Sequence, residues 1–341
     1  MSENTNTTKR RSAIQIMGSL IGLVKPLLHI MLAAIILGTL GYLCAIFLTI
    51  LAGQVIMHGL LTGVAGMIVP VDNMWRVFTP VKTIITVMIV IAVLRGILHY
   101  VEQYCNHFIA FKLLAIIRHK VFAALRKLCP AKLEGRDKGN LISIITTDIE
   151  LLEVFYAHTI SPIAIATLTS IIMVIFIGRY HWLAGVIALV AYLIVGVVIP
   201  MWNGKRGSQK GMEFRTNFGE LNSFVLDSLR GLDETIQYGQ GEKRKEQMSE
   251  HSKNLAGMQE SLSKMEGSQR SFTNMVILLA SFGMLALTIW LYDKGAMGFE
   301  GILTCTIAMM GSFGPVVALS SLSNNLNQTL ASGERVLSLL E

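Results

Sequence analysis

The stretch that decides the fold runs from Val81 to Leu128 and reads VKTIITVMIVIAVLRGILHYVEQYCNHFIAFKLLAIIRHKVFAALRKL. It contains no proline and a single glycine, and Pro80 and Pro130 stand close to its two ends. A helix of this length extends about 72 Å at 1.5 Å per residue. Because the hydrocarbon core of a bilayer is only about 30 Å thick, the stretch predicts a membrane-crossing helix whose second half extends beyond the lipid.

The second half of this stretch carries a pattern suited to packing outside the lipid. Apolar side chains recur at helical spacing, and basic side chains lie largely beside them. The apolar stripe consists of Phe108, Phe111, Leu114, Ile117, Val121, Phe122, Leu125 and Leu128. We therefore expect contacts with neighbouring helices beyond the bilayer. Two further segments, His181 to about Tyr238 and Glu242 to Tyr292, also combine an apolar span with a polar helical extension.

Composition extends the membrane interpretation to the whole chain. The 341 residues are 52% hydrophobic and only 15% charged, with a mean hydropathy of +0.56, whereas soluble domains carry about 25% charged residues. Six apolar runs each approach or exceed the roughly 20 residues that a spanning helix needs: 27–57, 81–101, 160–178, 182–201, 272–292 and 296–320. The predicted fold class is therefore all-α, an integral membrane protein with six transmembrane helices and long cytoplasmic extensions.

The net charge of +7 is explained by topology. If the first span leaves the cytoplasm, most of the 29 basic residues fall on the cytoplasmic side, as the positive-inside rule requires. The exceptions are Arg76, Lys82, Arg95, Arg179 and Lys294. We therefore expect a multi-pass cell-membrane protein with both termini in the cytoplasm, the lipid bilayer as a partner and no nucleic-acid partner. The four cysteines have no ligand-like spacing, so no metal site is predicted.

Three short segments occur in an order that resembles one transporter family. They are Gly139–Asp148 (GNLISIITTD), Gly231–Gly239 (GLDETIQYG) and Ala331–Glu341 (ASGERVLSLLE). The first resembles the first coupling-helix segment of ABC exporters of the type I fold, and the other two resemble the corresponding later segments. The resemblance implies one half of a dimeric exporter that works by alternating access and is driven by ATP.

The resemblance also implies a division of the chain. Residues 1–25 would form a cytoplasmic N-terminus with an interfacial elbow helix, residues 26–320 the six-helix transmembrane domain, and residues 321–341 a linker toward a nucleotide-binding domain. Coupling tips are expected at about 131–147 and 238–246. The residues expected to couple to the nucleotide-binding domain are Gly139, Asn140, Ser143, Asp148, Tyr238 and Gly239.

The sequence contains no Gly-x-x-x-x-Gly-Lys-Ser/Thr loop for binding phosphate. Its one Gly-Lys pair, Gly204–Lys205, is followed by Arg206. We therefore do not expect this chain to be an enzyme on its own. ATP and Mg²⁺ would bind to a nucleotide-binding domain that is either a separate polypeptide or a continuation beyond Glu341.

Within the family, several features look most like the CydC half of CydDC-type exporters: Glu102, His107–Leu114, Pro130, Gly139 and Ile160–Pro162. These exporters are heterodimers associated with cysteine and glutathione export and with haem. The resemblance implies a thiol or haem-type solute and a second exporter half. One departure is His99, which occupies a position where relatives carry arginine.

The predicted second span carries the candidate substrate-binding residues. Arg95, His99, Glu102 and Asn106 fall at i, i+4, i+7 and i+11, and therefore on one helix face. Charged side chains inside a membrane usually face a bundle interior or a water-filled cavity. Arg95 could hold a substrate carboxylate through paired hydrogen bonds, and His99 or His107 could offer an imidazole to haem iron or to a peptide.

Alternatives remain at this point. Arg95 and Glu102 could form an ion pair that seals the helix interface, and His107 could simply be a packing residue of the cytoplasmic extension. At the level of function, the alternatives are an exporter of peptides, lipids or drug-like compounds, and a non-transporting membrane regulatory partner of the same fold.

Overall fold

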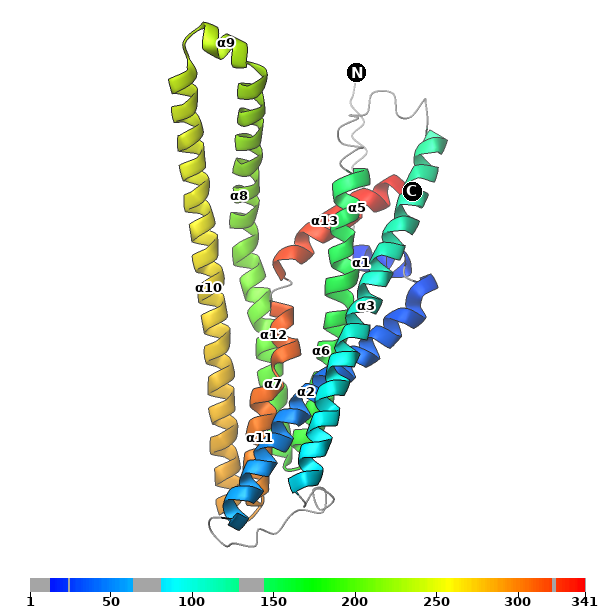
Figure 1. Cartoon of the computed structure of the whole chain (residues 1–341), viewed down its shortest axis with the longest axis vertical. Coiled ribbons are helices and arrows are strands. Elements are labelled where there is room, and N and C mark those ends of the chain that lie inside the picture. The colour runs from blue at the N-terminus through cyan, green and yellow to red at the C-terminus, as the bar shows by residue number, and fades with distance from the viewer. Residues whose placement is uncertain (1–12, 24, 64–80, 129–143, 321–322, 341) are drawn as a thin grey trace, which may run out of the picture. The chain divides into compact units, whose positions relative to one another are not determined.

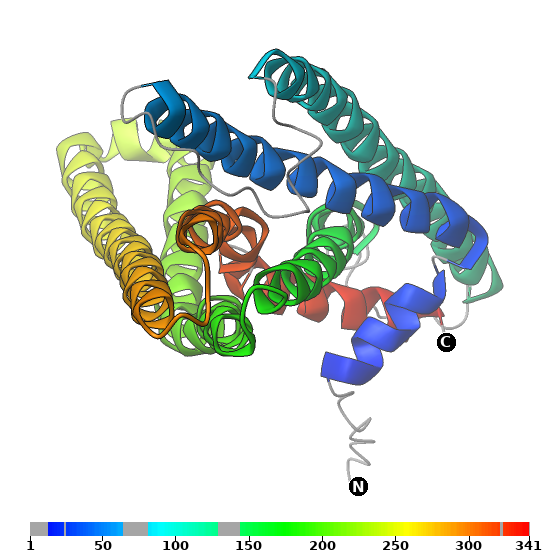
Figure 2. The ribbon, with the colours of Figure 1, turned by 90° about the horizontal axis from the view of Figure 1, so that it is seen from below.

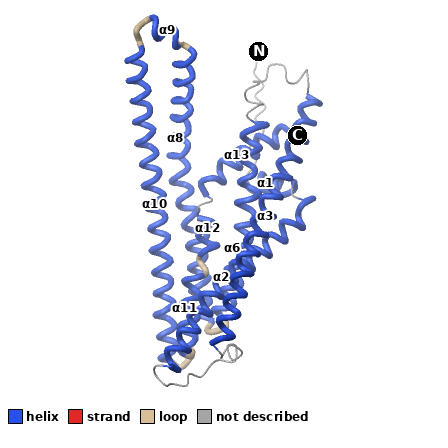
Figure 3. The backbone as a smooth tube through the Cα atoms, in the orientation of Figure 1, coloured by secondary structure: helices blue, strands red, loops and turns tan. Residues whose placement is uncertain are grey.

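The computed structural model describes residues 13–23, 25–63, 81–128, 144–320 and 323–340. These residues form helices joined by short turns (Figures 1 and 3). The α-helices are α1 (Ala13–Leu23), α2 (Leu28–Gly63), α3 (Val81–Leu128), α5 (Ile149–Phe155), α6 (Ser161–Gly178), α7 (Trp182–Leu193), α8 (Ile199–Arg230), α9 (Leu232–Gln237), α10 (Gly241–Asp293), α11 (Phe299–Gly311), α12 (Gly314–Ser320) and α13 (Ser323–Leu340). A 3₁₀ turn (Lys25–Leu27) precedes α2, and π-helical turns occupy Ile144–Asp148, Tyr156–Ile160 and Ile194–Val198.

Six helical segments of the described chain are long and apolar enough to cross a membrane: Lys25–Met57, Lys82–Lys127, Ile144–Gly178, Trp182–Trp202, Gly241–Asp293 and Phe299–Leu319. This confirms the predicted all-helical fold with six spans. The fourth segment has an exposed tryptophan at each end, Trp182 and Trp202. Tryptophan is enriched where a transmembrane helix meets the two membrane surfaces, so this pair fits the ends of one span.

The central prediction concerned α3, which is one uninterrupted helix from Val81 to Leu128. The prediction that the apolar stripe on its second half packs against neighbouring helices was only partly right. Leu114, Ile117 and Val121 are buried, whereas the side chains of Phe108, Phe111 and Phe122 are 41%, 59% and 63% exposed. The stripe predicted from sequence was wider than the face that neighbouring helices cover, and the buried face also includes Ile109 and Leu113.

The described chain divides into two compact units, one made of residues up to Gly196 and from Ile277 onward, the other of Val197–Val276. In the first unit α3 lies along α2, and α6 forms a hairpin with α7 (Figure 2). Gly38 allows α2 to approach its neighbours, because a Cβ there would collide with Ile165 Cδ1 and lie 3.0 Å from Glu102 Cγ. The first unit therefore places α2 directly against the polar face of α3.

The second unit is a long hairpin of α8 and the first part of α10, joined by α9 (Figure 1). Its two arms contact each other through side chains. The Arg244 guanidinium carbon lies 5.1 Å from the centre of the Phe224 ring, whose centre is 5.4 Å from that of His251. Farther along, Lys210 Nζ donates to Ser261 Oγ at 3.1 Å. The hairpin is thus a pair of largely polar helices with a compact end.

The end of this hairpin is closed by a helix C-cap around Gly239. The Gln240 amide donates to Thr235 O at 2.9 Å and the Gly239 amide donates to Ile236 O at 3.1 Å. This pair of hydrogen bonds defines a Schellman motif. Gly239 has a φ of 62°, in the left-handed region that only glycine adopts without a steric penalty.

Replacing Gly239 by alanine is expected to destabilise this cap by about 1 kcal/mol, because an L-residue in the left-handed conformation costs roughly that amount. The measurement is amide hydrogen exchange, with protection over residues 235–240 falling about fivefold. Gly219→Ala is the matched control, since Gly219 lies inside α8 and a Cβ at this position would have no neighbour within 4 Å. Equal protection in the two variants would contradict the strain at Gly239.

Candidate functional site on the polar face of α3

The polar face of α3 changes from exposed to buried along its length. Arg95 and His99 are exposed, whereas Glu102 and Asn106 are only 4% and 2% exposed. Glu102 is buried because α2 and the start of α6 pack around it. Gly38 has no side chain, so α2 can approach α3 closely at this point. The structure therefore keeps all four predicted residues on one face but gives them different surroundings.

Glu102 is the centre of a hydrogen-bonded group formed within α3 itself. Its carboxylate accepts hydrogen bonds from Asn106 Nδ2 at 2.7 Å and from Gln103 Nε2 at 3.2 Å, and His99 Nδ1 lies 3.1 Å from Oε2. A buried carboxylate needs such partners, since leaving it unpaired in an apolar setting is costly. The carboxylate is therefore satisfied by residues one, three and four positions away on its own helix.

Arg95 stands apart from this group. Across the described residues it forms no ion pair with Glu102, which pairs with His99 instead. Arg95 is exposed. The Glu102 carboxylate consequently leaves the Arg95 charge available to a ligand.

His99 and His107 have different roles in the structure. His99 Nδ1 lies 3.1 Å from Glu102 Oε2, and the His99 side chain is 64% exposed. His107 Nδ1 lies 3.9 Å from Glu153 Oε1 of α5, and its ring centre lies 5.5 Å from that of His158. His107 therefore belongs to the contact between α3 and the α5 region rather than to the Glu102 group. The described residues contain no cluster of three or more His, Cys, Asp or Glu side chains arranged to hold a metal ion.

The residues expected to couple to an ATPase fall into three groups. Gly139, Asn140 and Ser143 lie outside the described residues, as does most of the first expected tip. Tyr238 is 73% exposed and adjoins Gly239 at the end of the α8–α10 hairpin, where a partner can reach it. Asp148, by contrast, is only 4% exposed and contacts α13.

Three partners of these residues were not foreseen from the sequence. Gln103 adds a donor to Glu102, and Ser332 and Arg335 both reach Asp148. Gln103 could have been suspected because it is adjacent to Glu102. The contacts of Asp148 join residues 184 and 187 positions apart, and no local spacing rule indicates such a pair.

Comparisons with known proteins agree with this architecture. The family model for the ABC transporter transmembrane region matches residues 27–316. A probable ABC transporter ATP-binding/permease protein of Haemophilus influenzae is 42% identical over 97% of this chain and 58% of the relative. The glutathione/L-cysteine transport system ATP-binding/permease protein CydC of the same organism is 21% identical over 74% of this chain and 44% of the relative.

A third relative has another printed function: the ATP-dependent lipid A-core flippase of Pasteurella multocida is 24% identical over 76% of this chain and 45% of the relative. The chain thus spans between 44% and 58% of the length of these relatives. The likeness to CydC is distant and no stronger than the likeness to the flippase. Six apolar helical spans and the family match together show that the chain belongs to the ABC transporter transmembrane region family.

Proposed function

We propose that this membrane domain exports a small solute that carries a carboxylate, with a thiol such as cysteine or glutathione as the first candidate and a haem-type compound as the second. The observation that carries the proposal is the exposed Arg95 on the polar face of α3, beside a Glu102 carboxylate that is already paired. Cysteine, glutathione and haem all carry carboxylates. A guanidinium binds a carboxylate through two parallel hydrogen bonds, which fixes both position and orientation.

The energetics favour a ligand for Arg95. An arginine at the centre of a bilayer costs at least about 2.5 kcal/mol on insertion scales, and this chain retains one within a candidate span. A charged residue held at such a cost is a functional candidate, and among the described residues the nearby Glu102 pairs with His99 instead of Arg95. His99 lies one turn away and offers a second polar contact.

The ABC membrane domain works with an ATPase domain, which binds ATP and Mg²⁺. We propose that this partner contacts the tips at about 131–147 and 238–246, that the second exporter half is a different chain, and that both termini are cytoplasmic. The proposed division is an N-terminal segment with an elbow helix (1–25), the transmembrane domain (26–320) and a linker (321–341). The exposed Tyr238 beside the rigid Gly239 cap supports the second tip as a contact surface.

A second candidate is export of lipid, with peptide or drug-like compounds as related possibilities. It is supported by the similarity to the lipid A-core flippase, which equals the similarity to CydC in extent. A third hypothesis is a non-transporting regulatory partner of the same fold. The three hypotheses differ in which solute, if any, the assembled complex transports when ATP is supplied.

The test uses the complete transporter with its ATPase, reconstituted in inside-out vesicles. ATP-dependent uptake of labelled cysteine, glutathione, haem and a fluorescent lipid is compared for the wild type and Arg95→Ala. In Arg95→Ala, uptake of the solute that carries a carboxylate is expected to fall by about tenfold to a hundredfold, because a hydrogen bond to a charged group contributes about 1.5–3 kcal/mol. Arg95→Lys is expected to retain part of the uptake, since it keeps the charge but loses the paired geometry.

Arg179→Ala is the matched control, because Arg179 is an exposed arginine in the short turn after α6. Uptake by this variant should match the wild type. Unchanged uptake of cysteine, glutathione and haem in Arg95→Ala would overturn the assigned role of Arg95. Uptake of lipid alone would favour the second candidate. ATP turnover without uptake of any solute would favour the hypothesis of a regulatory partner.

A further inference from the structure

Asp148 has an unusual position for an acidic residue near an expected coupling tip. It ends the π-helical turn Ile144–Asp148 and directly precedes α5. Its carboxylate is buried yet paired with α13, since Ser332 Oγ donates to Oδ1 at 3.0 Å and Arg335 Nε lies 3.1 Å from Oδ2. Because a buried carboxylate is costly to separate from its partners, this contact resists opening. We call Asp148, Ser332 and Arg335 the α13 anchor.

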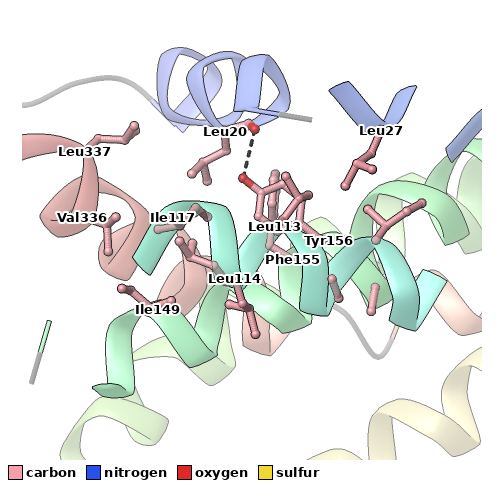
Figure 4. Packing of buried hydrophobic residues seen from close by; sticks show 14 of the residues in the cluster. Leu20, Leu27, Leu113, Leu114, Ile117, Ile149, Phe155, Tyr156, Val336 and Leu337 are labelled. Carbon is pink, nitrogen blue, oxygen red and sulfur yellow. Dashed lines mark hydrogen bonds between the residues drawn. The ribbon is translucent and has the colours of Figure 1, made fainter. Parts of the chain in front are cut away.

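The residues that follow Arg335 on α13 enter an apolar cluster whose members come from α1, α2, α3, α5, α6 and α13 (Figure 4). From α13, Val336, Leu337 and Leu339 are buried in this cluster. Ser332, Arg335, Val336 and Leu339 recur at i, i+3, i+4 and i+7, so the anchor and the apolar contacts share one face of α13. The other members of the cluster include Ile16 and Leu20 of α1, Leu113, Ile117 and Val121 of α3, and Ile149, Leu152 and Phe155 of α5.

α1 is also joined to this cluster by a hydrogen bond. Tyr156 Oη donates to the Leu20 carbonyl at 3.0 Å, as the dashed line in Figure 4 shows. A Cβ at Gly333 would lie 2.9 Å from Leu20 Cδ1, so α13 and α1 are in close contact. α13 therefore contacts both α1, through Gly333, and the start of α5, through the anchor.

The cluster also connects α13 to the helix that carries the candidate substrate-binding face. α5 and α3 share the apolar core through Leu152 and Leu113, and they are linked at the surface by Arg118 and Glu150, 3.5 Å apart. α3 is one helix over its full length, so its contacts with α5 and the residues Arg95 and His99 lie on the same uninterrupted element. α13 and α5 thus reach α3 through the apolar cluster, and the α3 helix itself leads from the cluster to this face.

We propose that Asp148 is a positioning residue that keeps α13 fixed to α5 throughout the transport cycle, so that α13, α5 and α3 shift as one body. Movement of the ATPase partner would then reach the α3 face through α13 as well as through the tips. Asp148 acts within the chain in this proposal, through Ser332 and Arg335. The inference rests on the proposed transport function and deepens it by naming a second route of coupling.

The first experiment separates transport from ATP turnover in the reconstituted transporter. Asp148→Ala is expected to lower ATP-dependent uptake by about tenfold, in the range of typical coupling free energies, while basal ATPase activity stays within about twofold. Asp148→Glu, which keeps the charge, should restore part of the uptake. Asp227→Ala is the matched control, because Asp227 is an exposed aspartate on α8; its uptake should equal that of the wild type.

The second experiment needs no transport substrate. Leu337 is only 6% exposed, so in a background without other cysteines a Leu337→Cys thiol should resist a water-soluble maleimide. Adding Asp148→Ala should expose this thiol and accelerate labelling, whereas adding Asp227→Ala should not. Unchanged labelling and unchanged uptake in the Asp148→Ala background would overturn the proposal.

A third experiment tests whether the anchor remains closed during turnover. Cysteines replacing Asp148 and Ser332 remove the anchor contacts, so before joining this variant should show the low uptake expected of Asp148→Ala. Joining the two thiols with a short bis-methanethiosulfonate reagent replaces the anchor by a covalent link and is expected to raise uptake, and reduction should lower it again. Uptake that falls further on joining would show that the anchor must open and would overturn the proposal. If even the wild type moves no solute while the labelling results hold, the proposed transport function fails and the anchor between α5 and α13 stands.

Discussion

Replacing Gly185 by alanine is expected to force α6 and α7 apart and to destabilise the transmembrane domain by about 3 kcal/mol, at the upper end of the usual cost of overpacking. A Cβ at Gly185 would lie 2.9 Å from Gly178 Cα and 3.3 Å from Val174 O. Both neighbours belong to the α6 backbone, which cannot rotate away as a side chain can. Small residues allow this close approach of helices in a membrane, where packing rather than hydrophobic burial drives association.

The measurement is the thermal midpoint of the detergent-purified protein, followed by loss of the monodisperse peak in size-exclusion chromatography. Gly283→Ala is the matched control, because Gly283 lies within α10 and no atom falls within 4 Å of a Cβ built there. This control should be neutral or slightly stabilising, since alanine is the better helix former by about 1 kcal/mol. Equal midpoints for the two variants would refute the close packing of α6 on α7.

Phe155→Ala is expected to destabilise the cluster between α1, α3, α5 and α13 by about 3–5 kcal/mol, the usual cost of removing a buried phenylalanine side chain. Phe155 is fully buried, and its ring centre lies 5.3 Å from that of Tyr156 in an edge-to-face arrangement. The loss would leave a cavity next to the Tyr156 hydrogen bond to Leu20. We therefore expect α1 and α13 to detach before the spans unfold.

Limited proteolysis measures this order directly, with cleavage in α1 and α13 appearing at lower temperature than cleavage elsewhere. Phe122→Ala serves as the comparison, because Phe122 lies on α3 in the same region and is 63% exposed. Its removal should change the cleavage temperature little. A Phe155→Ala protein that resists proteolysis as well as the Phe122→Ala protein would show that the cluster does not hold α1 and α13.

The length and polarity of the helices could be predicted from the sequence because these properties are local. Proline breaks a helix, and about 20 consecutive apolar residues cross a bilayer, so α3 and the six spans follow from the positions of prolines and apolar runs. The same local geometry placed Arg95, His99, Glu102 and Asn106 on one face. The apolar stripe of α3 was predicted too wide, since the sequence does not reveal how much of a helix face its neighbours cover.

The partner of Glu102 was decided by packing. The sequence left open an ion pair with Arg95, two turns away, whereas the structure pairs the carboxylate with His99 and Asn106. Spacings of three and four residues on a helix bring side chains into contact, while a spacing of seven requires long side chains to extend along the axis. Burial of Glu102 against Gly38 fixes the carboxylate near its closest donors.

The sequence by itself determined that this chain is a set of membrane-crossing helices with long extensions, and that one of these helices presents an arginine and a histidine on the same face. Only the tertiary structure decided that Glu102 is buried and pairs with His99 instead of Arg95, and that Asp148 binds Ser332 and Arg335 of α13. The physical reason is distance along the chain. Helix length and the face on which a residue lies follow from neighbours within a few residues, whereas Asp148 takes its partners from a helix that is packed against it, although these partners are 184 and 187 residues away.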